Sequence, residues 1–431
     1  MFSDKSIFWC AAFVCCTIPA YCQDPVSSTA LRDLISAAVA NNQELAALQS
    51  RSIEAKGLLR QAGVKPPLTL DVGVASGHPL GTVGEEEYSA GVGRTIERGG
   101  KRSRRVELAE VRVSQVESEY RERLRQLSYE IKLRYFDALT DSRRFQILEA
   151  ILAANQRSLD VTRARVVRGD AAQLDQSLIE VEVGRVEADR ASVVGRLEAA
   201  LTDLRRLAGL AAPLSTTLDS AFPLGPLDRD LETLKRTANE LRPDLAMARL
   251  VERFGEAEMR LVDAEGRPDV AVTARYFKRN GQFDDQYGTT SSGTRTLLRD
   301  QDDILAISVS VPILTKRRNL GNMEAAQARV LGARQRSRFL ENAIPLEVES
   351  AWRSWVSTRR TASILETSVL PQAQKNLDIV QQAYQLGQLR ILDVLNEQRR
   401  LLDTRLAALE NLSVAAKSFA NLERAVGEEI Q

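Results

Sequence analysis

The stretch EYSAGVGRTIERGGKRS, residues 87–103, decides the fold because two patterns of different period meet in it. From Tyr88 to Val92 every second residue is apolar, which is the period of a strand with one apolar face. The pair Gly99-Gly100 follows, and from Lys101 to Arg168 the chain has neither proline nor glycine. Apolar residues recur there at helical spacing. We therefore expect a strand that turns into a helix of about 68 residues, roughly 100 Å long.

The same plan extends on both sides of this stretch. A helix at about Ser28 to Ala62 ends before Pro66-Pro67, because proline cannot continue a helix. A second alternating segment follows at about 68–76, and the strand within the opening stretch covers about 87–97. Gly169 interrupts the long helical pattern, and another helix runs from about Ala171 to Leu207. The unit therefore reads helix, strand, strand and a long helical hairpin over 101–207.

The unit occurs twice in the chain. The segment Gly91–Ile96 matches Ser308–Ile313 at an offset of about 217, Tyr135 matches Trp352, and Gly169 matches Gly387 at 218. A polar stretch between Lys278 and Asp303 is longer than its counterpart in the first copy, and we expect it to be a loop. The expected organisation is a first repeat at 23–208, a connector at 209–227 and a second repeat at 228–431, with strands at about 269–278 and 304–314 and a helical hairpin at 319–426.

The N-terminus has the pattern of a secretory leader, residues 1–22. Lys5 precedes an apolar run, and all four cysteines lie within these 22 residues. Cleavage after Cys22 would leave a mature chain that can form neither disulfides nor thiolate metal sites. The alternative is a lipoprotein acylated on Cys22. No run of 18 apolar residues follows the leader, so any entry into a membrane has to be by strands.

Composition argues against several classes of function. The net charge is +1 and the pI about 7.6, so nucleic acid is not an expected partner. His78 is the only histidine, and with no mature cysteine we expect no enzyme, no cofactor and no intrachain metal site. The segment Gly99–Ser103 lies between a strand and a helix, as a phosphate loop does, but Thr95 and Arg102 do not fit the required spacing.

Four strands per chain are too few to close a membrane barrel, since the smallest such barrels have about eight. Three copies would supply twelve. We therefore expect a mainly α protein with a small membrane β part, in which several chains share one barrel and the long helices continue it as a duct.

The junction Gly91–Ser103 resembles the strand-to-helix junction of TolC-like outer-membrane efflux proteins, especially the cobalt-zinc-cadmium (CzcC-like) branch. The segments Ala383–Gly387 and Leu392–Gln398 are similar to the second hairpin tip of that family. The resemblance implies a homotrimer in outer-membrane lipid, that is, a trimeric twelve-stranded β-barrel continued by a periplasmic α-barrel. It also implies a periplasmic adaptor (membrane-fusion) protein and an inner-membrane pump of the resistance-nodulation-division type as partners.

The resemblance also implies roles for individual residues. Asp393, six positions after the tip glycine, would narrow the periplasmic mouth together with Asn396 and the repeat mate Asp175. The alternative is that Asp393 caps a helix or forms an ion pair. The expected adaptor contacts at the tips are Arg165, Arg168, Gly169, Tyr384, Leu386 and Gly387.

Two further groups concern the membrane part. Gly99, Gly100, Lys101 and Arg102 would form the strand-to-helix junction, with the basic pair near the inner membrane–water boundary. Tyr88, Tyr276 and Phe277 would belong to aromatic girdles.

The resulting hypothesis is a passive exit duct for substrates delivered by a pump, with divalent heavy-metal cations as the first cargo. Drugs, small organic molecules or a secreted polypeptide are alternative cargoes. A periplasmic coiled-coil scaffold or adaptor without a pore is the alternative function.

Overall fold

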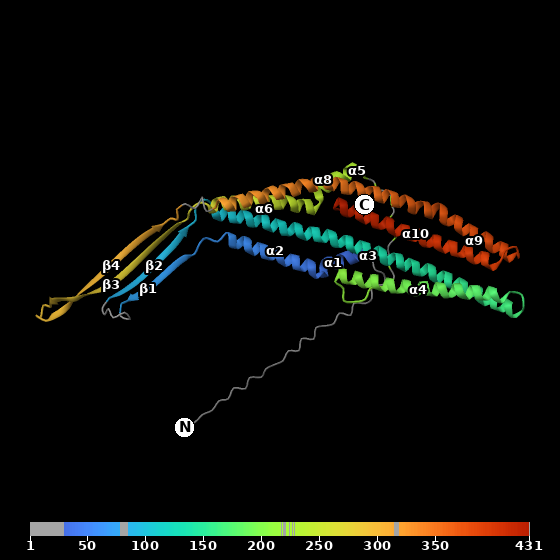
Figure 1. The fold of residues 1–431 in the computed structure, drawn as a ribbon, viewed down its shortest axis with the longest axis horizontal. Coiled ribbons are helices and arrows are strands. Elements are labelled where there is room, and N and C mark those ends of the chain that lie inside the picture. The colour runs from blue at the N-terminus through green and yellow to red at the C-terminus, as the bar shows by residue number, and fades with distance from the viewer. Residues whose placement is uncertain are drawn as a thin grey trace, which may run out of the picture.

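The computed structural model describes residues 30–430 apart from 78–84, 217, 219, 220, 224, 226, 228 and 314–318. The expected leader with its four cysteines and His78 therefore lie outside the described residues. The strands lie at one end of an elongated molecule, and the turns between its long helices lie at the other end (Figure 1).

Each half of the chain contributes two short helices, two strands and a long helical hairpin. The first half contains α1 (Leu31–Asn41), α2 (Gln43–Ala62), β1 (Leu68–Ser76), β2 (Glu86–Ile96), α3 (Lys101–Val167) and α4 (Gln173–Ala208). The second half contains α5 (Leu231–Leu241), α6 (Pro243–Glu265), β3 (Val270–Thr289), β4 (Arg295–Ser310), α8 (Leu320–Ile364), the π-helical segment η2 (Leu365–Val369), α9 (Leu370–Gln385) and α10 (Ile391–Val426).

The single helix expected from Ser28 to Ala62 is wrong, because the chain breaks at Asn42 into α1 and α2. Asn42 has an extended backbone, and its side-chain oxygen accepts hydrogen bonds from the amides of Glu44 and Leu45. Asparagine often caps a helix in this way rather than continuing it. Its amide nitrogen donates to the Leu207 carbonyl at 3.0 Å, so the break also fastens α2 to the end of α4.

The two long helices are each covered by two shorter ones. Figure 1 shows α2 and α4 following one another along α3, and α6 and α10 following one another along α8, and these pairs are in contact. Buried residues on matching faces of α3 and α8 form the core of the two halves. Leu127 and Ile131 correspond to Ile344 and Val348 at an offset of 217, and all four are almost completely buried.

The π-helical segment η2 interrupts the second long helix where the first is regular. The repeat offset is 217 at Tyr135 and Trp352 but 218 at Gly169 and Gly387, so the second hairpin has one extra residue in this interval. A π turn spans one residue more than an α turn, so η2 accommodates it. Pro371, the second residue of α9, has no amide hydrogen to donate to the turn before it.

The four strands form one antiparallel sheet in the order β1-β2-β3-β4. The polar stretch between Lys278 and Asp303, expected to be a loop, is largely strand: β3 continues to Thr289 and β4 begins at Arg295. Cross-strand pairing compensates for its weak apolar pattern, with Gly281 opposite Asp300 and Thr289 opposite Arg295. The β3–β4 hairpin therefore extends well beyond β1 and β2, which end near Ser76 and Glu86.

Candidate functional site

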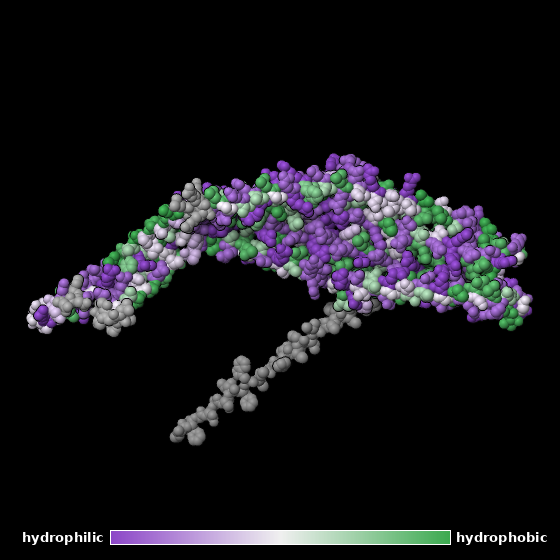
Figure 2. Space-filling view, viewed as in Figure 1, coloured by the Kyte–Doolittle hydropathy of each residue, from purple (hydrophilic) through white to green (hydrophobic). Residues whose placement is uncertain are grey.

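One face of the sheet is a continuous apolar surface. The register aligns Leu70, Val92, Ala274 and Ile307 across the four strands, and the next row outward contains Val72, Ala90, Tyr276 and Leu305. Leu70 is 73% exposed and Ile307 72% exposed. Figure 2 shows hydrophobic side chains along the strand end of the molecule. Burying such side chains is favourable, so this face needs an apolar medium or partner.

Among the described residues, no helix combines the length and the apolar character needed to cross a membrane.

Tyr88 and Tyr276 lie on the apolar face, where each hydroxyl donates to a carboxylate. Tyr276 Oη is 2.5 Å from Asp303, and Tyr88 Oη is 2.9 Å from Glu86. A tyrosine whose ring lies on an apolar surface and whose hydroxyl contacts a polar group is typical of the boundary between membrane and water. Phe277 follows Tyr276 directly in β3 and lies on the opposite face, so it cannot join the two tyrosines in one outward girdle.

The strand-to-helix junction holds the two repeats together. Gly99 and Gly100 have positive φ of 76° and 72°, and a Cβ at Gly99 would lie 2.7 Å from Arg267 Cδ. Asp269 of the second repeat accepts both the Lys101 ammonium at 2.8 Å and the Arg98 amide at 3.0 Å. Arg102 Nε donates to the Gly63 carbonyl at 2.6 Å. These glycines and basic residues therefore stabilise the contact between the two repeats at the base of the sheet.

The structure brings the two hairpin tips together at the far end of the molecule. Gly169 and Gly387 have φ of 77° and 74°, the left-handed conformation that favours glycine. Arg165 Nη1 donates to Tyr384 Oη at 3.3 Å, which joins the first tip to the second. Arg168 pairs with Asp170 at 3.4 Å, and the Leu386 side chain next to the second glycine is 74% exposed.

Asp393 caps α10. Its carboxylate accepts the Arg390 amide at 3.0 Å, while the Asp393 amide donates to the Arg390 carbonyl at 3.0 Å. The side chain is nevertheless exposed, as is that of Asn396, whereas Asp175 in the first turn of α4 is half-buried. Capping is one of the two alternatives expected from the sequence, and it leaves the charge of Asp393 accessible to solvent.

A charged network in the middle of the molecule was not expected from the sequence. Arg242, at the break between α5 and α6, is 4% exposed and donates to Asp244, Glu347 and the Ala425 carbonyl. Burial is the largest single influence on the pKa of Asp244 and would raise it, but the hydrogen bond and the charge of Arg242, together with the charge of Arg125, outweigh burial and lower the pKa. The sequence offers only a weak indication of this network: Arg242 occupies, in the second repeat, the position that Asn42 occupies in the first.

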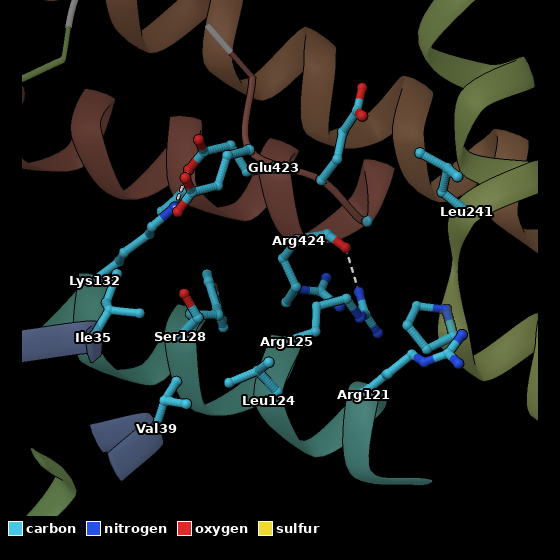
Figure 3. A pocket seen from close by; sticks show the side chains of 16 residues that line it. Ile35, Val39, Arg121, Leu124, Arg125, Ser128, Lys132, Leu241, Glu423 and Arg424 are labelled. Carbon is cyan, nitrogen blue, oxygen red and sulfur yellow. Dashed lines mark hydrogen bonds and ion pairs between the residues drawn. The ribbon is translucent and has the colours of Figure 1, made fainter. Parts of the chain in front are cut away.

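A cavity of about 480 Å³ lies beside this network, between α1, α3, α10 and the break before α6. Figure 3 shows Lys132 pointing to Glu423 on one side and Arg125 donating to the Arg424 carbonyl on another. Lys132 Nζ lies 2.9 Å from Glu423 and 3.3 Å from Glu429. Burial raises the pKa of Glu423, although Lys132 acts in the opposite direction. The charges lining the cavity thus largely satisfy one another.

The described part of the chain contains no group of three or more histidine, cysteine or acidic residues placed to hold a metal ion. The acidic side chains around the central cavity are instead bound to arginine or lysine, as Asp244 and Glu347 are to Arg242 and Glu423 is to Lys132.

Comparison with known families agrees with this geometry. The family model for outer membrane efflux proteins matches residues 34–210 and 234–428, one segment in each repeat. The chain belongs to this family. The protein is therefore an outer-membrane efflux channel whose helical part lies in the periplasm, and its family is one of ducts rather than enzymes.

Individual members of the family show how far the likeness extends. The cobalt-zinc-cadmium resistance protein CzcC of Cupriavidus metallidurans is 24% identical over 421 residues, covering 95% of this chain and 93% of CzcC. A crystal structure of CusC has a TM-score of 0.75 at 20% identity, covering 93% of this chain and 92% of CusC. The open-state structure of the MtrE channel of Neisseria gonorrhoeae has a TM-score of 0.73 at 18% identity, covering 92% of this chain and 89% of the MtrE chain. These structural likenesses establish the fold.

Proposed function

We propose that three copies of this chain close their sheets into a twelve-stranded barrel, which is continued by an α-barrel into a tripartite efflux duct. The observation that carries this proposal is the four-stranded sheet with one exposed apolar face and two free edges, β1 and β4. Four strands cannot close a barrel, and the unpaired backbone N–H and C=O groups of an edge strand can form hydrogen bonds with another strand. Pairing β4 of one copy with β1 of the next satisfies both edges.

The helical part supplies the periplasmic length of the duct. α3 has 67 residues, which corresponds to roughly 100 Å. The tips around Gly169 and Gly387 would then meet a periplasmic adaptor, with an inner-membrane pump of the resistance-nodulation-division type supplying energy. The exposed Leu386 and Arg168, and Arg165 and Tyr384 at the contact between the tips, are the residues placed to touch that adaptor.

Divalent heavy-metal cations are the cargo that the similarity to CzcC favours. Three exposed Asp393 carboxylates around one axis would attract cations and repel anions. Asn396 supplies no second ring, and the half-buried Asp175 adds charge from the first repeat. Drugs, small organic molecules and secreted polypeptide remain the alternative cargoes.

The assembly is tested by the molar mass of the detergent-extracted protein from purified outer membranes, corrected for bound detergent. Three times the mass of the mature chain supports the shared barrel. A monomer or dimer would overturn it and favour a periplasmic scaffold without a pore.

The cargo is tested by growth of a deletion strain on cobalt, zinc and cadmium. We expect loss of tolerance, restored by the wild-type chain and restored less well by Asp393→Asn. Asparagine keeps an oxygen for the Arg390 amide, so this variant separates the charge of Asp393 from its cap. Unchanged tolerance in the deletion strain would count against metal cargo.

A further inference from the structure

The face of the sheet opposite the apolar one carries mostly small side chains on β1 and β2, and its larger side chains come from β3 and β4. One cross-strand row contains Asp71, Gly91, Arg275 and Ala306, and the next row outward contains Gly73, Ser89, Phe277 and Ile304. In the proposed barrel this face lines the lumen, because the apolar face contacts lipid. The β3 side chains therefore project over neighbours that leave space for them.

Arg275 and Gly91 fit together closely. A Cβ at Gly91 would lie 3.1 Å from both Cβ and Cγ of Arg275, so the arginine stem lies across the glycine. The guanidinium carbon is 5.7 Å from the centroid of the Phe277 ring, a cation–π distance. Gly91 and Phe277 thus keep the Arg275 side chain close to the surface of the sheet.

Arg275 is also without a carboxylate partner among the described residues, unlike the neighbouring cation. Arg279, in the row beyond Phe277, is paired with Glu87 at 2.9 Å, and Asp302 lies in the same row. Asp71, in the row of Arg275, lies two strands away, about 10 Å across the sheet, and has no ion pair within the described residues. The row that contains Asp71 and Arg275 therefore carries one anion and one cation, and neither forms an ion pair within the described residues.

We propose that Asp71, Arg275 and Phe277 form a selectivity layer for cargo inside the outer-membrane part of the duct, separate from the Asp393 mouth. The proposal rests on the trimeric barrel of the proposed function. Threefold symmetry places three Asp71 carboxylates in one ring and three Arg275 guanidinium groups in a second ring close to it, with three Phe277 side chains one row farther along the sheet. The layer binds cations at Asp71 and anions at Arg275, so it suits small ions leaving with their counter-ions. Phe277 narrows the passage.

The test is ion selectivity of the purified trimer in planar lipid bilayers under a salt gradient. Asp71→Asn is expected to lower the cation-to-anion permeability ratio about twofold, and Arg275→Gln to raise it about twofold, since each removes one sign of charge. Phe277→Ala is expected to raise conductance with little change in that ratio. Arg94→Gln is the matched control, because Arg94 lies on the apolar face, level with Leu68 and Val272.

Chemical modification makes the test independent of how well each variant folds. Residues 23–431 contain no cysteine, so Arg275→Cys introduces the only thiol of a mature chain cut after Cys22. A positively charged thiol reagent added to open channels is expected to restore the wild-type permeability ratio, and a negatively charged one to shift it the other way. The same ratio after both reagents, or equal shifts in Arg94→Gln and Arg275→Gln, would overturn the layer. Absence of any wild-type conductance would instead refute the proposed duct.

Discussion

Arg165 and Tyr384 lie 219 positions apart in the sequence, and a hydrogen bond of 3.3 Å from Arg165 Nη1 to Tyr384 Oη joins the two hairpin tips. One residue belongs to the end of α3 and the other to the end of α9. Any separation of the hairpins at this end of the molecule has to break this contact.

Replacing Tyr384 with phenylalanine removes the acceptor oxygen and keeps the ring. A hydrogen bond of this kind contributes about 1 kcal/mol, so the population with separated tips should rise about fivefold. We expect a higher mean conductance of the reconstituted channel. Tyr120→Phe is the control, because Tyr120 accepts a hydrogen bond from Gln49 far from the tips. Equal conductance for Tyr384→Phe and wild type would show that this contact does not hold the tips together.

Arg242 should matter more for stability than an exposed arginine. Its removal leaves Asp244 and Glu347 without their buried partner, and we expect Arg242→Met to lower the free energy of unfolding by about 3–5 kcal/mol. Arg249, which pairs with Glu341 and is 48% exposed, is the matched site, where Arg249→Met should cost less than about 1 kcal/mol. Denaturant titration of both variants measures the difference, and similar losses would refute the importance of burial.

Glu423 should make the protein less stable as pH rises. Burial raises the pKa of this carboxyl in the folded state, so its contribution is fully present below the unfolded pKa and is lost as pH rises through the folded one. Glu423→Gln removes this dependence, and we expect the variant to gain thermal stability relative to wild type as the pH rises above about 4, the unfolded pKa of a glutamate.

The control is Glu410→Gln, at an exposed carboxylate 3.2 Å from Arg144. A relative stability of Glu423→Gln that stays constant with pH would contradict the raised pKa of Glu423.

Two glycines with similar backbone strain should respond differently to alanine. Gly209 and Gly169 have φ of 66° and 77°, but only at Gly209 would a Cβ lie 2.7 Å from the Asn41 carbonyl oxygen. Gly169→Ala should cost about 1–2 kcal/mol from the left-handed backbone alone. Gly209→Ala should cost clearly more and loosen α1 from α4. Unfolding midpoints of the two variants decide this, and equal losses would show that α1 can move away freely.

Much of the fold follows from local patterns in the sequence. The period of the apolar residues predicts strands and long helices, and the glycines at 169 and 387 predict the turns between antiparallel helices. The duplication is visible because matching residues recur at nearly constant offset. These features depend on neighbours in the chain, so the sequence by itself determined them, together with the likeness to a family of outer-membrane efflux proteins.

Other features depend on residues far apart in the chain, and only the tertiary structure decided them. The break at Asn42 is fastened by the Leu207 carbonyl, the strand over the polar stretch after Lys278 is held by its cross-strand partners, and Arg242 is neutralised by Glu347. The face on which Phe277 lies follows from the period of the strand, but its contact with Arg275 over Gly91 follows from the register. Register and long-range pairing arise from packing between elements, which no local pattern encodes.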